Sequence, residues 1–255
     1  MTSTLKTAAP RSGGPALADA KPRAAMPESP CKACAARHLA VCGVLSSDEL
    51  YQLTTILNTV VLKPGEQLLF EGDPAKYVFN VTAGTLKLYK LLADGRCQVT
   101  GFLYPGDFLG IANREIYVSS AEAVVATSLC RFRKDQLDEM LKRFPHMEQR
   151  MMTMAADELA AAQDQMLLLG RKSAKEKIAS FLLVLARKAA QRGEQETTLH
   201  VPMSRADMGD YLGLTTETVS RCFTQLKTER LISIRTGGYV ELLDREALED
   251  LAEGI

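Results

Sequence analysis

The arrangement of apolar positions changes near residue 134, where a strand-like pattern gives way to a helical one. Before that point, short segments rich in Val, Leu, Phe, Tyr and Thr are separated by turn signals: Pro64-Gly65, Gly72-Asp73, Gly84, Asp94-Gly95 and Pro105-Gly106-Asp107. Closely spaced turns between apolar strands predict an antiparallel β-sandwich or β-roll. Its last strands are expected at residues 120–126 and 128–132. An N-cap serine followed by acids predicts a helix over residues 47–58 before the roll.

The second region opens with a short helix to about residue 142 and a long helix over residues 146–170, separated near Pro145. Apolar residues follow the long helix at steps of three and four: Met152, Ala155, Leu159, Ala162, Met166 and Leu169. This spacing is typical of a helix that pairs with another helix. A helix of about 25 residues reaches beyond one small domain. That length favours a homodimer over the alternative, in which the stripe packs only on the roll.

The C-terminal third predicts a helix-turn-helix followed by a β-hairpin. In chain order, the expected elements are helix 173–192, strand 199–202, helix 204–212, turn 213–215, helix 216–229, hairpin 232–242 and a terminal helix from residue 244. Gly213 permits the left-handed backbone that two crossing helices need at their turn. The inward face of the second helix is expected to contain Val219, Leu226 and either Cys222 or Phe223.

The second of these helices carries polar side chains suited to reading DNA near its start: Thr216, Glu217, Ser220 and Arg221. In a helix-turn-helix this end enters the major groove, where Arg bonds guanine O6 and N7 and Glu accepts from cytosine N4. Ser204 and Arg205 are further candidate DNA contacts. The alternative is a helical hairpin with a Glu217–Arg221 surface ion pair. The hairpin that follows favours double-stranded DNA as the partner, because a β-wing commonly accompanies a DNA-binding helix-turn-helix.

The length predicts a protein of two domains, since 255 residues exceed the usual size of one. The expected division is a disordered arm (1–28), a cysteine-bearing segment with the roll (29–143), the dimerisation helix (144–170) and the DNA-binding domain (171–255). The formal net charge is zero, but residues 171–235 contain 12 Lys and Arg against 7 Asp and Glu. This mild positive excess lies where DNA is expected to bind. The sequence has no apolar run of membrane-spanning length and no signal-peptide core, so we expect a cytoplasmic protein.

Three of the six cysteines, Cys31, Cys34 and Cys42, fall within twelve residues of one another. Thiolates are the usual ligands of iron–sulfur clusters and of structural zinc. Three local ligands need a fourth from elsewhere, and the candidates are Cys97, Cys130 and His38. The spacing by itself does not separate iron–sulfur from zinc. The recognition-helix cysteine, Cys222, is expected to be a small buried apolar residue.

Together these features resemble the cyclic-AMP receptor protein superfamily, and Thr-Glu-Thr-Val-Ser-Arg at 216–221 resembles its fumarate and nitrate reduction regulator (FNR) branch, of the α-proteobacterial FnrN and FixK type. The resemblance covers the chain from about Cys31 onward. It implies an α+β fold: an antiparallel β-roll like that of cyclic-nucleotide-binding domains, a long dimerisation helix and a C-terminal winged helix-turn-helix. It also implies a homodimer that reads TTGAT-type inverted repeats through Glu217, Ser220 and Arg221 and controls genes of anaerobic or microaerobic metabolism.

For the cysteines, the resemblance implies an oxygen-labile [4Fe-4S] cluster held by Cys31, Cys34, Cys42 and Cys130, since FNR-type sensors use three N-terminal cysteines and one at the end of the roll. Loss of the cluster then dissolves the dimer and releases DNA. FNR-type dimer helices often carry an acid in the stretch that is Leu159 to Ala162 here, and this chain has none there. We therefore expect more dimer to persist without the cluster. Roll loops such as 94–97 are expected to contact RNA polymerase.

Other ligands and an enzymatic activity are disfavoured by what the sequence lacks. A cyclic nucleotide needs an Arg for its phosphate, and residues 106–121 have none in the family's pattern, Arg114 being out of place. The histidines are scattered, with no evident pair of haem ligands. No Gly-rich phosphate loop and no convergent acid–base set indicates an enzyme. We therefore expect a regulator that binds no cyclic nucleotide, is not a haem sensor and catalyses no reaction.

Overall fold

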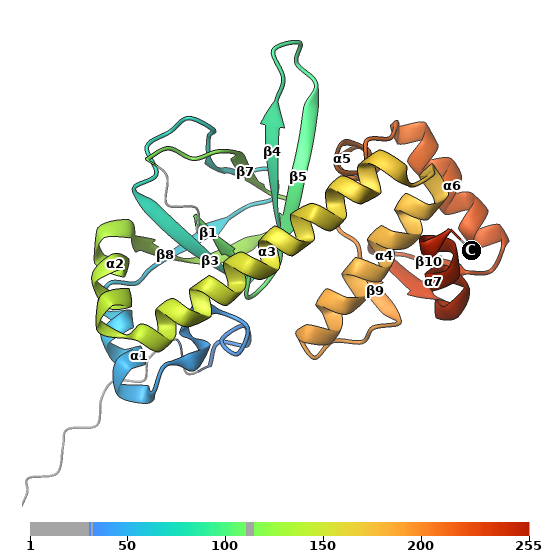
Figure 1. The fold of residues 1–255 in the computed structure, drawn as a ribbon. Coiled ribbons are helices and arrows are strands. Elements are labelled where there is room, and N and C mark those ends of the chain that lie inside the picture. Colours follow the sequence, from blue (N-terminus) through green and yellow to red (C-terminus); the bar gives the residue numbers. More distant parts are fainter. Residues whose placement is uncertain (1–30, 32, 111–114, 255) are drawn as a thin grey trace, which may run out of the picture.

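A computed structural model describes residues 31, 33–110 and 115–254, so the predicted disordered arm lies outside the described residues. The described chain forms a β-roll, a long helix and a helical domain with a small sheet, in that order (Figure 1). A short 3-10 helix, η1 (Val41–Val44), and helix α1 (Ser47–Thr54) precede the roll. The predicted α+β architecture is thereby confirmed.

The roll consists of two four-stranded antiparallel sheets. In spatial order, one contains β1 (Asn58–Leu62), β8 (Thr127–Arg133), β3 (Tyr77–Ala83) and β6 (Phe108–Leu109), and the other contains β2 (Gln67–Leu69), β7 (Ser120–Ala123), β4 (Leu86–Leu91) and β5 (Cys97–Leu103). Because successive side chains on a strand point to opposite faces, Val81, Leu86 and Leu129 are completely buried between the sheets. Gly84, at the β3–β4 turn, has φ +86°, and a Cβ there would lie 2.4 Å from the Ala126 carbonyl oxygen.

Several predicted boundaries are wrong by a few residues. Of the two serines before the acids, Ser46 is the one that caps α1. The helix ends at Thr54 rather than 58, because the chain turns through residues 55–57 to enter β1. Strand β7 ends at Ala123, and β8 begins at Thr127, whose hydroxyl bonds both backbone polar groups of Thr85. Strand β9 covers Thr198–His200 rather than 199–202. The ends of β8 and β9 depend on pairing with distant segments, which local sequence does not reveal.

Helix α2 (Lys134–Arg143) and helix α3 (Pro145–Arg171) are separated by Phe144, with φ −122° and ψ 81°. A residue before proline is disfavoured in the helical region, whereas proline itself is accepted at the first position of a helix. Helix α3 has 27 residues and runs from the roll to the C-terminal domain (Figure 1). Within the described part of the chain, no helix is both long and apolar enough to cross a membrane.

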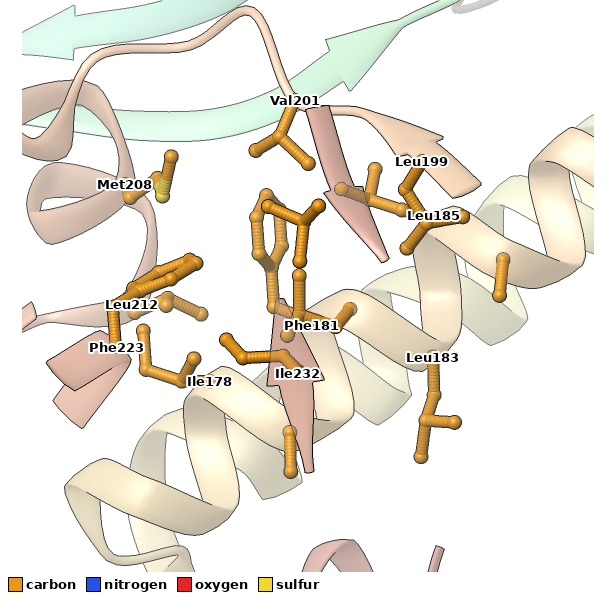
Figure 2. Packing of buried hydrophobic residues seen from close by; sticks show 14 of the residues in the cluster. Ile178, Phe181, Leu183, Leu185, Leu199, Val201, Met208, Leu212, Phe223 and Ile232 are labelled. Atoms are coloured by element: carbon orange, nitrogen blue, oxygen red, sulfur yellow. The ribbon is translucent and has the colours of Figure 1, made fainter. Parts of the chain in front are cut away.

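The C-terminal domain packs a helix-turn-helix and a three-stranded sheet on helix α4. Its elements are α4 (Ala174–Gln191), β9, α5 (Arg205–Leu212), α6 (Thr216–Thr228), β10 (Ile232–Arg235), β11 (Tyr239–Leu242) and α7 (Arg245–Glu253). Phe181 of α4 lies in the middle of the core, with Met208, Leu212 and Phe223 of the helix-turn-helix on one side (Figure 2). The same core includes Val99 and Phe102 of the roll, so the two domains share one apolar core.

Candidate functional site

The first helix of the helix-turn-helix, α5, is closed at both ends by its own sequence. Ser204 Oγ accepts from the Asp207 N–H at 3.0 Å, and Asp207 Oδ2 accepts from the Ser204 N–H at 3.1 Å, which is a capping box. Gly213 ends the helix at φ +63°, a conformation that strains residues with a Cβ. Gly209 is required as well, because a Cβ there would lie 2.6 Å from the Leu214 carbonyl oxygen. Sequence reasoning missed Gly209, since a glycine inside a helix gives no local sign of the segment that crosses it.

The second helix, α6, buries one face and exposes the predicted reading face. Its inward residues are all buried, with both Cys222 and Phe223 among them: Val219, Cys222, Phe223 and Leu226. The predicted readers are all exposed: Thr216, Glu217, Ser220 and Arg221. Backbone and Thr215 hydroxyl hydrogen bonds at the helix start lower the pKa of Glu217. That carboxylate is therefore an ionised acceptor, and α6 presents acceptors and a guanidinium to solvent at its N-terminal end.

Glu217 and Arg205 have partners within the motif that the sequence did not predict. In the described structure, Glu217 is held by the helix start and Thr215, and it forms no ion pair with Arg221. The Arg205 guanidinium lies 3.4 Å from the centroid of the Phe223 ring and donates to Met208 Sδ. Arg205 thus links α5 to α6 by a cation–π contact. Its role as a DNA contact stays a prediction.

The hairpin after α6 forms the predicted wing. Strands β10 and β11 pair in register from Ile232–Leu242 to Arg235–Tyr239, and β9 adds a third strand. The Arg235 side chain is exposed and pairs with Glu241 at 2.7 Å. The wing therefore carries an exposed guanidinium at the end of β10.

The N-terminal cysteines and Cys130 gather beside the roll. Cys31 is buried in an apolar cluster formed by the N-terminal segment, β8, α2 and the start of α3, and Cys42 and Cys130 pack against it. Burial, Cys31 and Cys34 raise the pKa of the Cys42 thiol to about 11. Burial and the other three thiols raise the pKa of Cys130 to about 12. All four cysteines therefore interact in one region.

These thiols are the soft donors that iron–sulfur clusters and zinc take. Among the described residues, no three His, Cys, Asp or Glu side chains are arranged as a metal-ligating group. The thiols thus share a region without forming a closed ligand sphere. Cys31 lies in a turn, Cys34 has no regular secondary structure and Cys42 lies in the short helix η1, so regular structure imposes little constraint on the N-terminal donors. The four thiols are of the donor type that both an iron–sulfur cluster and a zinc ion take.

The other candidate ligands lie elsewhere. Cys97 packs against the core shared with the C-terminal domain, where burial and Asp210 raise the pKa of its thiol. The two ring nitrogens of His38 lie at hydrogen-bonding distance from carbonyl oxygens, Nδ1 at 3.0 Å from that of Ala35 and Nε2 at 3.3 Å from that of Gln191. Of the three candidates, Cys130 is the one grouped with the N-terminal cysteines.

The segment between Cys34 and Cys42 also touches helix α3. Arg150, in α3, donates from Nη2 to the Leu39 carbonyl oxygen at 2.7 Å. Met147 of α3 is completely buried in the cluster that contains Cys31, and Met151 and Met154 pack against it. The cysteine segment is therefore in direct contact with the first half of α3. Sequence reasoning missed Arg150, because its partner is a backbone oxygen more than a hundred residues away.

The predicted stripe on α3 is largely uncovered along the described chain. Met152, Leu159 and Met166 are 67, 62 and 65 % exposed, Ala162 is exposed, Ala155 is half-buried, and Leu169 is 37 % exposed. The alternative that the stripe only packs on the roll is therefore wrong for most of its length. Exposed apolar patches of this kind mark protein–protein contacts.

Residues 106–121, which lack the arginine expected of a cyclic-nucleotide site, contact the C-terminal domain through Asp107. Asp107 Oδ2 accepts from Lys188 of α4 at 2.8 Å and from the Tyr104 N–H at 2.9 Å. Arg114 lies outside the described residues. Asp107 is thus paired with a lysine of the chain's own C-terminal domain.

Comparison with known proteins follows the same division of the chain. The family model "Crp-like helix-turn-helix domain" matches residues 176–251, and "Cyclic nucleotide-binding domain" matches residues 59–144. Among solved structures, that of FixK2 from Bradyrhizobium japonicum is similar, with a TM-score of 0.72 and 36 % identity over 77 % of this chain and 97 % of that one.

Curated relatives match nearly the whole chain. The transcriptional activatory protein AadR of Rhodopseudomonas palustris is 40 % identical over 91 % of this chain and 99 % of its own length. The nitrogen fixation regulation protein FixK of Bradyrhizobium diazoefficiens is 41 % identical over 87 % of this chain and 93 % of its own. The transcriptional activator protein FnrL of Cereibacter sphaeroides is 38 % identical over 84 % of this chain and 88 % of its own length. With its roll, long helix and winged helix-turn-helix, the chain belongs to the CRP/FNR family of DNA-binding transcription regulators.

Proposed function

We propose that this regulator responds to oxygen through a [4Fe-4S] cluster held by Cys31, Cys34, Cys42 and Cys130. The observation that carries the proposal is the gathering of these four thiols beside the start of α3, apart from Cys97 and Cys222. When bound, the group supplies a centre that oxygen degrades. The protein then acts in the cytoplasm as a homodimer on TTGAT-type inverted repeats, and controls genes of anaerobic or microaerobic metabolism.

The chain's own residues connect this region to dimer formation. Ligation by Cys31, Cys34 and Cys42 would order the segment whose Leu39 carbonyl accepts from Arg150. That order extends to Met147, Met151 and Met154, which anchor the first half of α3 in the same cluster. The exposed stripe at Met152, Ala155, Leu159, Ala162, Met166 and Leu169 is the proposed dimer surface. Two α6 helices are then presented to successive half-sites of DNA.

In the DNA-binding domain, Glu217, Ser220 and Arg221 are the residues proposed to read bases. Thr216 and Ser204 are proposed to lie beside the phosphate backbone of the DNA. All five are exposed at the N-terminal ends of α5 and α6. The turn at residues 94–97, at the tip of the β4–β5 hairpin, is the proposed contact with RNA polymerase. The hairpin projects away from α3 and from the C-terminal domain (Figure 1), so its tip is accessible to a further protein.

The second candidate is a regulator of the same family that uses zinc or thiol oxidation instead. It is favoured by the donor chemistry, because thiolates serve zinc and disulfides as well as iron. Both candidates are regulators without enzymatic activity, and both leave the roll without a cyclic nucleotide. Calorimetric titration with cyclic AMP should therefore show no heat of binding; saturable binding would contradict this part of the proposal.

Anaerobic purification followed by visible spectroscopy separates the two. We expect a brown protein whose absorbance bleaches in air, with about four iron and four sulfide per chain. A colourless protein with bound zinc would overturn the iron–sulfur assignment. Cys130→Ser should lose most of the iron, whereas Cys97→Ser is the matched control and should keep it. Equal iron loss in both variants would contradict the assignment of the fourth ligand.

A further inference from the structure

The outer face of the sheet β2-β7-β4-β5 is the surface against which the helix-turn-helix packs. Phe102 of β5 meets Tyr211 of α5 edge-on, with ring centroids 5.3 Å apart, and Phe181 of α4 lies 5.7 Å from the same tyrosine ring. Burial of these rings holds the domains together, but apolar burial is non-directional. The orientation of one domain on the other therefore needs directional contacts.

Two ion pairs of the described residues join the roll to the C-terminal domain, and the one made by Lys87 of β4 is less exposed than the Asp107–Lys188 pair. Its ammonium group lies 2.9 Å from Asp207 Oδ1 in α5 and 3.1 Å from Glu122 Oε1 in β7. Lys87 and Glu122 face each other in the β4–β7 register, so the roll alone fixes where the ammonium group stands. The Lys87 and Asp207 side chains are each 18 % exposed. Charged groups withdrawn from water to this extent are costly to leave without a partner.

Asp207 divides its two oxygens between two tasks. Oδ2 accepts from the Ser204 N–H and hydroxyl and so closes the α5 cap, while Oδ1 accepts from Lys87. Burial opposes ionisation, yet the bonds from Ser204 and Lys87 outweigh it and lower the pKa of Asp207. Gln98 of β5 adds a bond from Nε2 to the Asp210 carbonyl oxygen at 2.5 Å. The first turns of α5 are thereby fixed to β4 and β5.

We propose that Lys87 is a positioning residue for DNA binding, which fixes the direction in which the roll presents α6. Helix α5 leads through Gly213 directly into α6, so a rotation of α5 on the sheet rotates the reading face as well. In a dimer, both reading faces must meet half-sites at a set spacing. A change in domain orientation should therefore leave the affinity for a single half-site nearly unchanged. It should lower the affinity for two half-sites that are bound together.

Substitution of Lys87 should therefore change the affinities for paired and single half-sites unequally. Binding of two linked half-sites gains affinity only when the geometry allows both to engage. Lys87→Met keeps most of the apolar stem and removes the charge, and it should weaken binding to an inverted repeat by about tenfold or more. Binding to a duplex with one TTGAT half-site should change by less than about twofold, because α6 itself is intact. A residue that matters only for folding would weaken both.

The experiment compares the full-length, anaerobically purified protein with four variants on both duplexes, using fluorescence anisotropy. Lys87→Arg should restore affinity, since guanidinium can serve both acids. Asp207→Asn keeps an oxygen for the Ser204 cap but loses the charge, and should behave like Lys87→Met. Lys90→Met is the matched control: Lys90 lies on the same strand and pairs with Glu71 within the roll, where both side chains are well exposed.

A readout without DNA keeps the test decisive. Spin-labelled non-canonical residues at Val61 and Leu243, which are 68 and 52 % exposed, report the distance between the domains when labelled chains are diluted with unlabelled ones. We expect a narrow distance distribution in the wild type and in Lys90→Met, and a broad one in Lys87→Met and Asp207→Asn. Unchanged distributions, or equal losses on both duplexes, would overturn the proposal. If the wild type does not bind the TTGAT duplex, the predicted operator sequence is contradicted, and the proposed role of Lys87 is not.

Discussion

At the residue scale, two arginines of the helix-turn-helix show how context assigns a role. Arg205 and Arg221 both lie in first turns or near them, and either suits a DNA contact by composition. Arg205 lies over the Phe223 ring between the two helices, whereas Arg221 is exposed on α6. A half-buried guanidinium on an aromatic ring stabilises packing, while an exposed one can reach base edges. Arg221 is therefore the better candidate for base recognition.

Arg221→Ala tests this assignment. The variant should lose about 1–3 kcal/mol of discrimination at a single guanine of the operator, because a bidentate contact to one base is removed. Arg235→Ala on the wing should instead weaken binding to all sequences alike, as removal of a phosphate contact does. Competition binding with single-base operator variants measures both effects. Equal losses of Arg221→Ala on operator and random DNA would show that Arg221 does not read a base.

At the element scale, α3 joins the cysteine region to the proposed dimer surface within one continuous helix. Its first half is anchored by Met147 and by Arg150, and its stripe is exposed beyond that point. Ala162 occupies the stripe where an acid would make two like charges meet in a dimer. Because no such repulsion opposes pairing, the helices should remain associated more readily when the cysteine segment loses its cluster.

We therefore expect a substantial fraction of the cluster-free protein to remain dimeric. Ala162→Asp should weaken that dimer by about 1 kcal/mol or more, because like charges meet across a partly buried surface. Ala161→Asp is the control, since one residue along a helix turns the side chain by about 100° and away from the stripe. Sedimentation velocity at micromolar concentration measures the result. A wholly monomeric wild-type apo-protein would show that the apolar stripe is not enough for pairing.

At the scale of the whole molecule, one apolar core crosses from the roll to the DNA-binding domain. Val99, Phe102 and Tyr104 of the roll belong to the same cluster as Phe181 and Leu212. Removing either domain would expose the other's share of this core. The two domains are therefore coupled in stability as well as in orientation.

Phe102→Ala tests this coupling. Truncation of a buried phenylalanine costs about 3–5 kcal/mol, and here the loss should fall on both domains because the ring contacts Tyr211 and Phe181. Calorimetry should show one transition in the wild type and a lower midpoint, or two transitions, in the variant. Phe70→Ala, at a ring that is 58 % exposed, is the control and should shift the midpoint little. Two separate transitions already present in the wild type would contradict the shared core.

The sequence by itself determined the order of elements, the helix-turn-helix and the candidate chemistry, because these rest on local rules. Ser204 caps a helix and Gly213 ends it whatever surrounds them, and the stripe on α3 follows from helical periodicity. Even the polar face of α6 could be predicted, since Glu217 and Arg221 lie at fixed angles from the buried Val219.

The tertiary structure decided which distant residues meet. Local sequence left Cys97, Cys130 and His38 as candidates for a fourth ligand, and the family resemblance favoured Cys130. The pairing of β8 with β1 and β3 is what brings Cys130 beside the N-terminal cysteines. Likewise, the contacts of Lys87 with Asp207 and of Arg150 with Leu39 join residues more than a hundred positions apart. No periodicity encodes such contacts, because they depend on how complete elements pack. The parts of the proposed switch are thus visible in the sequence, whereas the connections between them arise from the fold.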